Sequence, residues 1–221
     1  MIPDRFAPAF EALPREFPIF PLPGALLLPH GRLPLNLFEG RYVAMAQDAI
    51  KADRIIGMVQ PLEYAPDPVP AEAALFETGC AGRITAFQET SDGRILITLH
   101  GLCRFRIANE IEGANGYRRV RADFEPYRDD MAEDAGFGID REALLGVLEP
   151  YFEARGLNAD WSAIEEADDE TLVVSLAMMC PFGLSEKQAL LEAPDMPGIG
   201  NVLMTLLAMS GAEDAASAAR H

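Results

Sequence analysis

Cysteine, histidine and tryptophan are rare in this chain of 221 residues, which contains three, three and one of them. Cys80, Cys103 and Cys180 stand alone and form no CxxC pair, which predicts small buried side chains rather than a disulfide framework. His100 and Cys103 are separated by an odd number of positions, so on one strand they would point to opposite faces. The sequence therefore predicts no metal site.

Long apolar runs are absent as well. No stretch of about 18 apolar residues exists, which excludes a membrane-spanning helix. The first residues lack the basic-then-apolar order of a secretory signal. With 49% apolar and 24% charged residues, the composition is that of an ordinary globular protein. We therefore expect a cytoplasmic protein with no membrane partner.

The motifs of common enzymes are missing too. The sequence contains no GxxxxGK[ST] phosphate loop, no GxSxG elbow and no HExxH zinc motif. Ser185 and Lys187 are two positions apart and would lie on different sides of a helix, so local spacing supports no Ser–Lys dyad. The sequence predicts a protein that is not an enzyme and needs no cofactor. An enzyme whose site forms only in three dimensions is the weaker alternative.

Acidic residues are in excess, and the excess is uneven. The formal net charge is −17. Residues 1–126 contain 16 acids and 13 bases, whereas residues 127–221 contain 19 acids and 5 bases. Such acidity repels phosphate backbones and disfavours general nucleic-acid binding. The acidity of the C-terminal part is either a solvated surface or a docking face for a basic partner.

The N-terminal part consists of short apolar segments. The stretch Phe17–Met45, FPIFPLPGALLLPHGRLPLNLFEGRYVAM, holds five prolines and then changes to a helical pattern. Asn36 and Glu39 resemble a capping box for a helix over residues 39–52. The segments that follow predict a small antiparallel barrel or sandwich. The expected strands are residues 17–22, 33–37, 55–60, 79–88, 94–99, 103–107 and 117–124.

The C-terminal part has a helical pattern. Residues 127–138 are interpreted as an acidic linker, and residues 1–15 and 210–221 as flexible termini. Pro150 is expected to kink or split the first helix, and Ser185 with Gln188 resembles a second capping box. The expected helices are residues 139–152, 170–179, 185–192 and 199–209, with a short turn around Trp161 over residues 159–167. The predicted fold class is therefore α+β, with a β-rich part followed by a helical bundle.

Several motifs are similar to those of one known family. They are FPIFPLPGALLLPHGRLPLNLFEGRYVAM, then Gly82-Arg83-Ile84, Asp92-Gly93-Arg94, and Gly101-Leu102 with Arg104-Phe105-Arg106-Ile107. With these motifs the chain resembles the N-terminal substrate-binding domain of Lon-type ATP-dependent proteases. Gly40 departs from the pattern, because the family often has proline there. The resemblance covers residues 16–209.

The resemblance implies a PUA-like antiparallel β pseudo-barrel with one helix over residues 16–126 and a helical bundle over residues 139–209. It implies recognition of unfolded or degron-bearing polypeptides, in an adaptor-like or chaperone-like role in bacterial-type protein quality control. A protease or chaperone machine is the partner expected on this ground. Because the motifs of the ATPase and protease domains are missing, the resemblance implies neither ATP hydrolysis nor proteolysis.

Two groups of residues are candidate binding sites. Leu26, Leu27, Leu28 and Leu33 are either pure core or part of an exposed apolar groove that binds polypeptides. The second group is the basic concentration formed by Arg104, Arg106, Arg118, Arg119 and Arg121. These arginines either pair with nearby acids at solvent-facing strand positions or mark an anion or RNA surface, since PUA-like barrels also occur in RNA-binding proteins.

Overall fold

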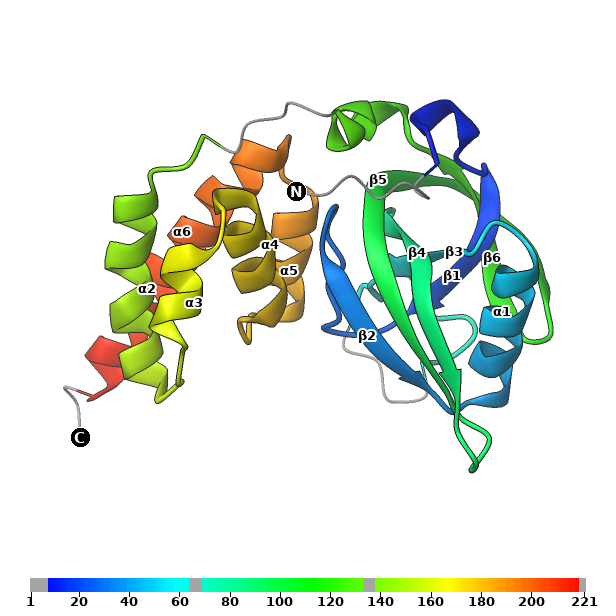
Figure 1. The fold of residues 1–221 in the computed structure, drawn as a ribbon, viewed down its shortest axis with the longest axis horizontal. Helices are drawn as coiled ribbons and strands as arrows, with labels where there is room; N and C mark the ends of the chain where they lie inside the picture. The colour runs from blue at the N-terminus through cyan, green and yellow to red at the C-terminus, as the bar shows by residue number, and fades with distance from the viewer. Residues whose placement is uncertain (1–7, 64–68, 133–137, 219–221) are drawn as a thin grey trace.

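Six strands form one sheet that closes into a barrel in the computed structural model, which describes residues 8–63, 69–132 and 138–218 (Figure 1). The strand order is β2-β5-β4-β3-β1-β6, and β5 also pairs with β6, so five strands close a ring and β2 extends it. Among the described pairings, only β1–β3 is parallel. The strands are β1 (Glu16–Pro21), β2 (Arg32–Leu37), β3 (Ile55–Val59), β4 (Thr78–Glu89), β5 (Ile95–Ala114) and β6 (Tyr117–Asp123).

Strand β5 connects most of the barrel, because its 20 residues pair with β2, β4 and β6. The sequence predicted two strands separated at Gly101, and this is wrong: β5 runs through that residue. Gly101 instead permits a close crossing, since a Cβ at this position would collide with the carbonyl oxygen of Leu28. Backbone hydrogen bonds fix the crossing, from His30 to Gly101 (2.9 Å) and from Gly101 to Gly31 (2.8 Å).

Helix α1 (Gly40–Lys51) packs on the barrel by one apolar stripe. The predicted capping box is wrong, because Asn36 is paired with Leu96 in the sheet and Glu39 is the N-cap residue without a side-chain cap bond. The ring of Tyr42 lies 4.2 Å from that of Phe20, which ties the helix to β1. The stripe buries Tyr42, Met45, Ala46 and Ala49.

Five α-helices form the second half of the described chain. Pro150 lies inside α2 without splitting it, so of the two expected effects of this proline the split does not occur. The predicted box of Ser185 and Gln188 is also wrong: the Glu186 carboxylate accepts the N–H of the N-cap Gly183 at 2.6 Å. The helices are α2 (Arg141–Arg155), α3 (Trp161–Glu166), α4 (Asp169–Met179), α5 (Leu184–Leu191) and α6 (Met196–Ala218).

Short 3₁₀ helices complete the described chain. One spans Phe10–Ala12, within the stretch that the sequence analysis assigned to a flexible terminus. The other, η2 (Glu125–Met131), occupies the first part of the predicted linker and buries Asp130. Residues 210–218, which the sequence analysis also assigned to a flexible terminus, belong to helix α6, so that part of the prediction is wrong. Within the predicted termini and linker, residues 1–7, 133–137 and 219–221 lie outside the described residues.

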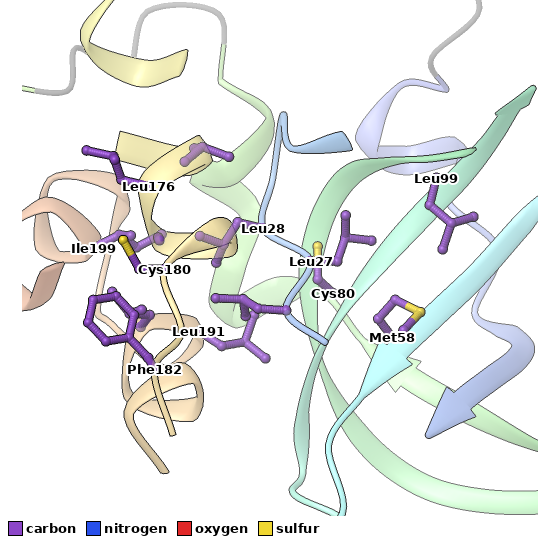
Figure 2. Close-up of a cluster of buried hydrophobic side chains, with 14 of the residues drawn as sticks. Leu27, Leu28, Met58, Cys80, Leu99, Leu176, Cys180, Phe182, Leu191 and Ile199 are labelled. Atoms are coloured by element: carbon purple, nitrogen blue, oxygen red, sulfur yellow. The ribbon is translucent and has the colours of Figure 1, made fainter. Parts of the chain in front are cut away.

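The two halves share one hydrophobic core (Figure 2). The segment between β1 and β2 lies at its centre, where Leu28 is fully buried beside helical side chains such as Leu191. Leu27 lies on the barrel side, against Gly82 of β4. The helical half is therefore docked on the barrel rather than linked loosely to it. The predicted α+β class is confirmed. Among the described residues, no helix is both long and apolar enough to cross a membrane.

Candidate polypeptide-binding surface

The leucines predicted as a binding groove are in the core. Leu26, Leu27 and Leu28 are 2%, 1% and 0% exposed. Leu33 is half-buried, pairs with Leu99 of β5 and packs against the same core. Of the two interpretations left open by the sequence, the structure supports pure core for the first three. These leucines join the two halves of the protein and offer no surface to a polypeptide.

The five arginines predicted as an anion or RNA patch do not gather on one surface. Arg104 was expected to face solvent but is only 1% exposed. Arg118 is bonded to the Glu110 carboxylate and to the carbonyl of Ala73. Arg121 pairs with Glu16 on the neighbouring strand β1. Arg106 is exposed on β5, and Arg119 lines a small hollow beside α1. For Arg118 and Arg121 the structure therefore agrees with the interpretation that they pair with nearby acids, and not with a free basic patch.

Arg104 is the polar centre of the contact between the barrel and the helices. Its Nε donates to Asp130 Oδ2 at 2.9 Å and its Nη2 to Oδ1 at 2.6 Å, which is a bidentate pair. Its Nη1 donates to the carbonyls of Leu191 and Ala193 at 3.2 and 2.5 Å. Burial opposes the charge of Arg104, but the hydrogen bonds and charge of Asp130 outweigh this effect and raise its pKa. We call this contact, made by Arg104, Asp130 and the two carbonyls, the joint.

Other buried polar groups bond across the same contact. Gln60 Nε2 donates to Gln188 Oε1 at 3.1 Å, and Gln188 Nε2 donates to the carbonyl of Thr78 at 3.3 Å. Lys187 Nζ donates to the carbonyl of Gly24 at 2.6 Å, while burial lowers its pKa. Because buried polar groups cost free energy unless they are bonded, these contacts favour one orientation of the two halves.

Large apolar side chains remain exposed at the hairpin end of the sheet. Phe38, Phe87 and Leu96 are 59%, 54% and 39% exposed. Leu96 on β5 is directly opposite Asn36 of β2 and Gln88 of β4, so Phe38 and Phe87 lie within two register positions of it. We call these three residues the apolar rim. Phe87 and Leu96 are on paired strands but on opposite faces of the sheet, because Phe87 pairs with Ile97, and Phe38 directly follows β2.

The sequence contained a signal for part of this rim. Ile95, Ile97 and Leu99 alternate with Leu96, so the alternation places Leu96 on the opposite, outer face. Phe87 pairs with the buried Ile97, which places it on the inner face, yet it is exposed, as are all residues from Thr85 to Glu89 at the end of β4. Periodicity shows which face a side chain is on, but not where the covering elements end.

A small hollow lies between β1, α1 and β6. It measures about 200 Å³, below the range of roughly 300–1,000 Å³ that small-molecule sites occupy. Asp48 lies on its wall, where the hydroxyl of Tyr117 donates to the carboxylate at 3.1 Å and lowers the pKa of the acid. Arg119 lines the same hollow. Its mixed charge and small size favour a structural role over the binding of a cofactor.

The family of the chain follows from comparison with known proteins. The model of the ATP-dependent protease La (LON) substrate-binding domain matches residues 16–198. The chain belongs to this family. It is 27% identical over 204 residues to Lon protease 2 of Myxococcus xanthus, covering 89% of this chain and 24% of that protein. It is 25% identical to Lon protease 1 of Bacillus subtilis, covering 84% of this chain and 24% of that protein. The chain thus spans about a quarter of the length of these curated relatives.

Solved structures of Lon N-terminal domains share the fold. The Lon N-terminal domain protein from Xanthomonas campestris has a TM-score of 0.58 at 24% identity, and the match covers 87% of this chain and 97% of that one. The N-terminal domain of the Mycobacterium avium complex Lon protease has a TM-score of 0.57 at 16% identity, covering 90% and 98%. The matches include both the barrel and the helical half, so the pairing of these halves is part of the Lon N-terminal fold.

Proposed function

We propose that this Lon-type substrate-binding domain binds unfolded or degron-bearing polypeptides without itself catalysing a reaction. The observation that carries the proposal is the apolar rim, where Phe87 and Leu96 are exposed on the paired strands β4 and β5 and Phe38 is exposed directly after β2. Folded proteins bury most of their large apolar side chains, whereas unfolded segments expose them. A surface of this kind therefore distinguishes the two states of a client.

The rim supplies side-chain contacts rather than a free strand edge. Among the described strands β2 pairs only with β5, so its other edge is open. Pro34 stands in the middle of β2 and has no N–H to donate, which weakens the pairing of a client strand there. Phe38 and Phe87 instead offer aromatic faces to apolar side chains of any sequence. Such contacts suit a protein whose clients share exposed apolar residues and no common motif.

In this role the domain is an adaptor or a chaperone in protein quality control. The Lon relatives carry the same domain in much longer chains, and we propose that the domain presents captured segments to a protease or chaperone machine. The binding step requires neither a cofactor nor a nucleophile, only apolar surface that stays exposed in the folded domain.

The proposal is tested by titrating the protein with a carboxymethylated, permanently unfolded model protein and with the same protein folded. We expect binding of the unfolded form to be at least about tenfold tighter, and the double substitution Phe38→Ser, Phe87→Ser to weaken it by about tenfold, since each ring loses a burial of roughly 1.5–3 kcal/mol at most. Leu62→Ser is the matched control, because Leu62 is 48% exposed and lies outside the rim. Equal affinity for the two forms would overturn the proposal.

A further inference from the structure

A second exposed apolar group lies on the helical half, at the turn between α2 and α3. The ring of Phe152 lies 6.0 Å from that of Trp161, and the two planes are tilted by 58°. Trp161 and Leu157 are 38% and 37% exposed, and Phe152 is half-buried. We call these three residues the aromatic edge. In Figure 1, α2 and α3 lie on the side of the helical half that faces away from the barrel, so the aromatic edge and the apolar rim are separate surfaces.

The aromatic edge is held in place by polar bonds. Arg141 of α2 donates to the carbonyls of Ile164 and Glu165 at 2.7 and 3.0 Å and pairs with Asp169 at 2.7 Å, which fixes α3 against its neighbours. Asp160 caps α3 by accepting the N–H of Ala163 at 3.2 Å. Trp161 is thus the first residue of a fixed helix rather than part of a free loop. A fixed aromatic side chain loses little entropy when it binds a partner.

The charge around the aromatic edge is predominantly negative. The segment 149–166 contains five acids and a single base, and all five acids are exposed. The base, Arg155, lies over the ring of Tyr151, 5.0 Å from its centroid. The acids are Glu149, Glu153, Asp160, Glu165 and Glu166. An apolar surface with this border attracts cations and repels anions.

We propose that the aromatic edge binds basic, apolar segments of polypeptides, in which Lys or Arg alternates with aliphatic residues. The aliphatic side chains contact Leu157 and Phe152, the cationic groups pair with the bordering carboxylates, and one cation lies over the face of Trp161. Charge selects this occupant. A nucleic acid or an anionic lipid surface is repelled, and so is the equally acidic helical half of a second copy.

The inference deepens the proposed function, on which it rests, because it names the class of client segment that a second surface selects. The two surfaces differ in the charge of the segments that they bind. The apolar rim accepts unfolded segments irrespective of charge, and the aromatic edge adds affinity for those that are basic. A client with both kinds of segment occupies both surfaces, and its total affinity then exceeds that of either contact alone.

Trp161 is the only tryptophan of the chain, so its fluorescence reports directly on the aromatic edge. The experiment titrates the full chain with a short peptide of Lys, Leu, Ala and Ser, and with the matched peptide in which Glu replaces every Lys. Neither peptide contains an aromatic residue. We expect the basic peptide to change the Trp161 emission saturably, the acidic peptide to leave it unchanged, and high salt to weaken the response.

Variants separate this inference from the proposed function. Leu157→Ser is expected to weaken the binding of the basic peptide by about tenfold. The triple change Glu153→Gln, Glu165→Gln, Glu166→Gln is expected to weaken this binding by about fivefold and to make it less dependent on salt. Met179→Ser, at a residue that is 82% exposed elsewhere on the helical half, serves as the control. Phe38→Ser with Phe87→Ser is expected to leave the Trp161 response intact.

A Trp161 response that is absent, or equal for the two peptides, overturns the inference. Binding of the basic peptide that is detected by anisotropy without a change in Trp161 emission also overturns it, since the peptide then lies elsewhere. These outcomes do not affect the proposed function of the apolar rim, because the binding of unfolded protein to the rim is measured separately.

Discussion

The barrel and the helical half differ in how they treat charge. In the barrel, acids and bases nearly balance over residues 1–126, and several arginines pair across strands, as Arg121 does with Glu16 and Arg118 with Glu110. In residues 127–221, 19 acids face only 5 bases, and Lys187 and Arg141 are committed to internal contacts. The surface acids of the helical half therefore remain available to a partner.

The difference shows how one chain presents two unlike surfaces. Backbone pairing closes the barrel, so its surface residues are free to be apolar at the rim without loss of the fold. The helices are held by apolar faces buried against one another and by carboxylate caps such as Asp168 and Asp140. The joint then fixes both surfaces in one rigid arrangement. Three predictions test whether the two halves also differ in what stabilises them.

The largest effect is expected at the joint. Arg104→Met leaves the Asp130 carboxylate buried without its partner, and breaking a buried pair in this way costs about 4 kcal/mol. The free energy of unfolding is measured in urea by two signals: Trp161 emission, which reports on the helical half, and circular dichroism, which reports on the whole chain. We expect the two transitions to coincide in the unmodified protein and to separate in the variant, with the helical half unfolding first.

Arg121→Met is the matched control, since it removes an exposed pair with Glu16 on the barrel alone. Exposed pairs contribute about 0–1 kcal/mol, so this change is expected to shift both transitions little and equally. If Arg104→Met were no more costly than Arg121→Met, the joint would contribute no more to stability than an exposed ion pair does.

Much of the barrel could be predicted from the sequence, because local patterns determine it. The alternation at Ile95, Ile97 and Leu99 located the first part of β5, and the apolar runs located β3 and β6 within one or two residues. The length of β5 was missed because glycine usually interrupts a strand, whereas Gly101 accommodates a crossing segment. The crossing segment contains Leu28, which is far from Gly101 in the sequence, so the pattern of residues around Gly101 cannot predict the crossing.

The joint was missed for the same reason. Arg104 alternates with Cys103 and Phe105, and alternation predicts a solvent-facing arginine. Its partners are Asp130, in a stretch interpreted as linker, and two carbonyls at and just after the end of α5. The acidic excess of the helical half was visible in the sequence, but its position around Trp161 required the packing of α3 against α2.

A smaller but substantial effect is expected from Leu28→Ala. Leu28 is 0% exposed at the contact of the two halves, and removing a buried leucine side chain costs about 3 kcal/mol through lost burial and the cavity left behind. Because the shared core belongs to both halves, we expect Trp161 emission and circular dichroism to shift together, unlike the result for Arg104→Met. Leu62→Ala, at an exposed position, is the control and is expected to change little. Separate transitions in Leu28→Ala would show that the core is less shared than its packing indicates.

The smallest effect concerns the helical half alone and depends on pH. Asp168 caps α4 by accepting the N–H of Thr171 at 2.8 Å, and this bond holds the pKa of the carboxyl below its ordinary value. A lowered pKa in the folded state means that the charged cap stabilises the protein above the pKa of the unfolded chain, near 4, and that this stabilisation is lost as the pH falls through the folded-state value. At pH 7 Asp168→Ala is expected to cost about 1 kcal/mol.

Urea unfolding at pH 7 and at pH 3, followed by Trp161 emission, tests the assignment. The difference between the unmodified protein and Asp168→Ala is expected to shrink at the lower pH, because the protonated carboxyl is the poorer cap. Asp168→Asn is the control, since an amide oxygen also caps a helix but does not titrate, so its stability is expected to fall less between the two pH values. A cost of Asp168→Ala that stays constant from pH 7 to pH 3 would mean that the charge of Asp168 contributes nothing, and that the acids of the helical half serve its surface rather than its fold.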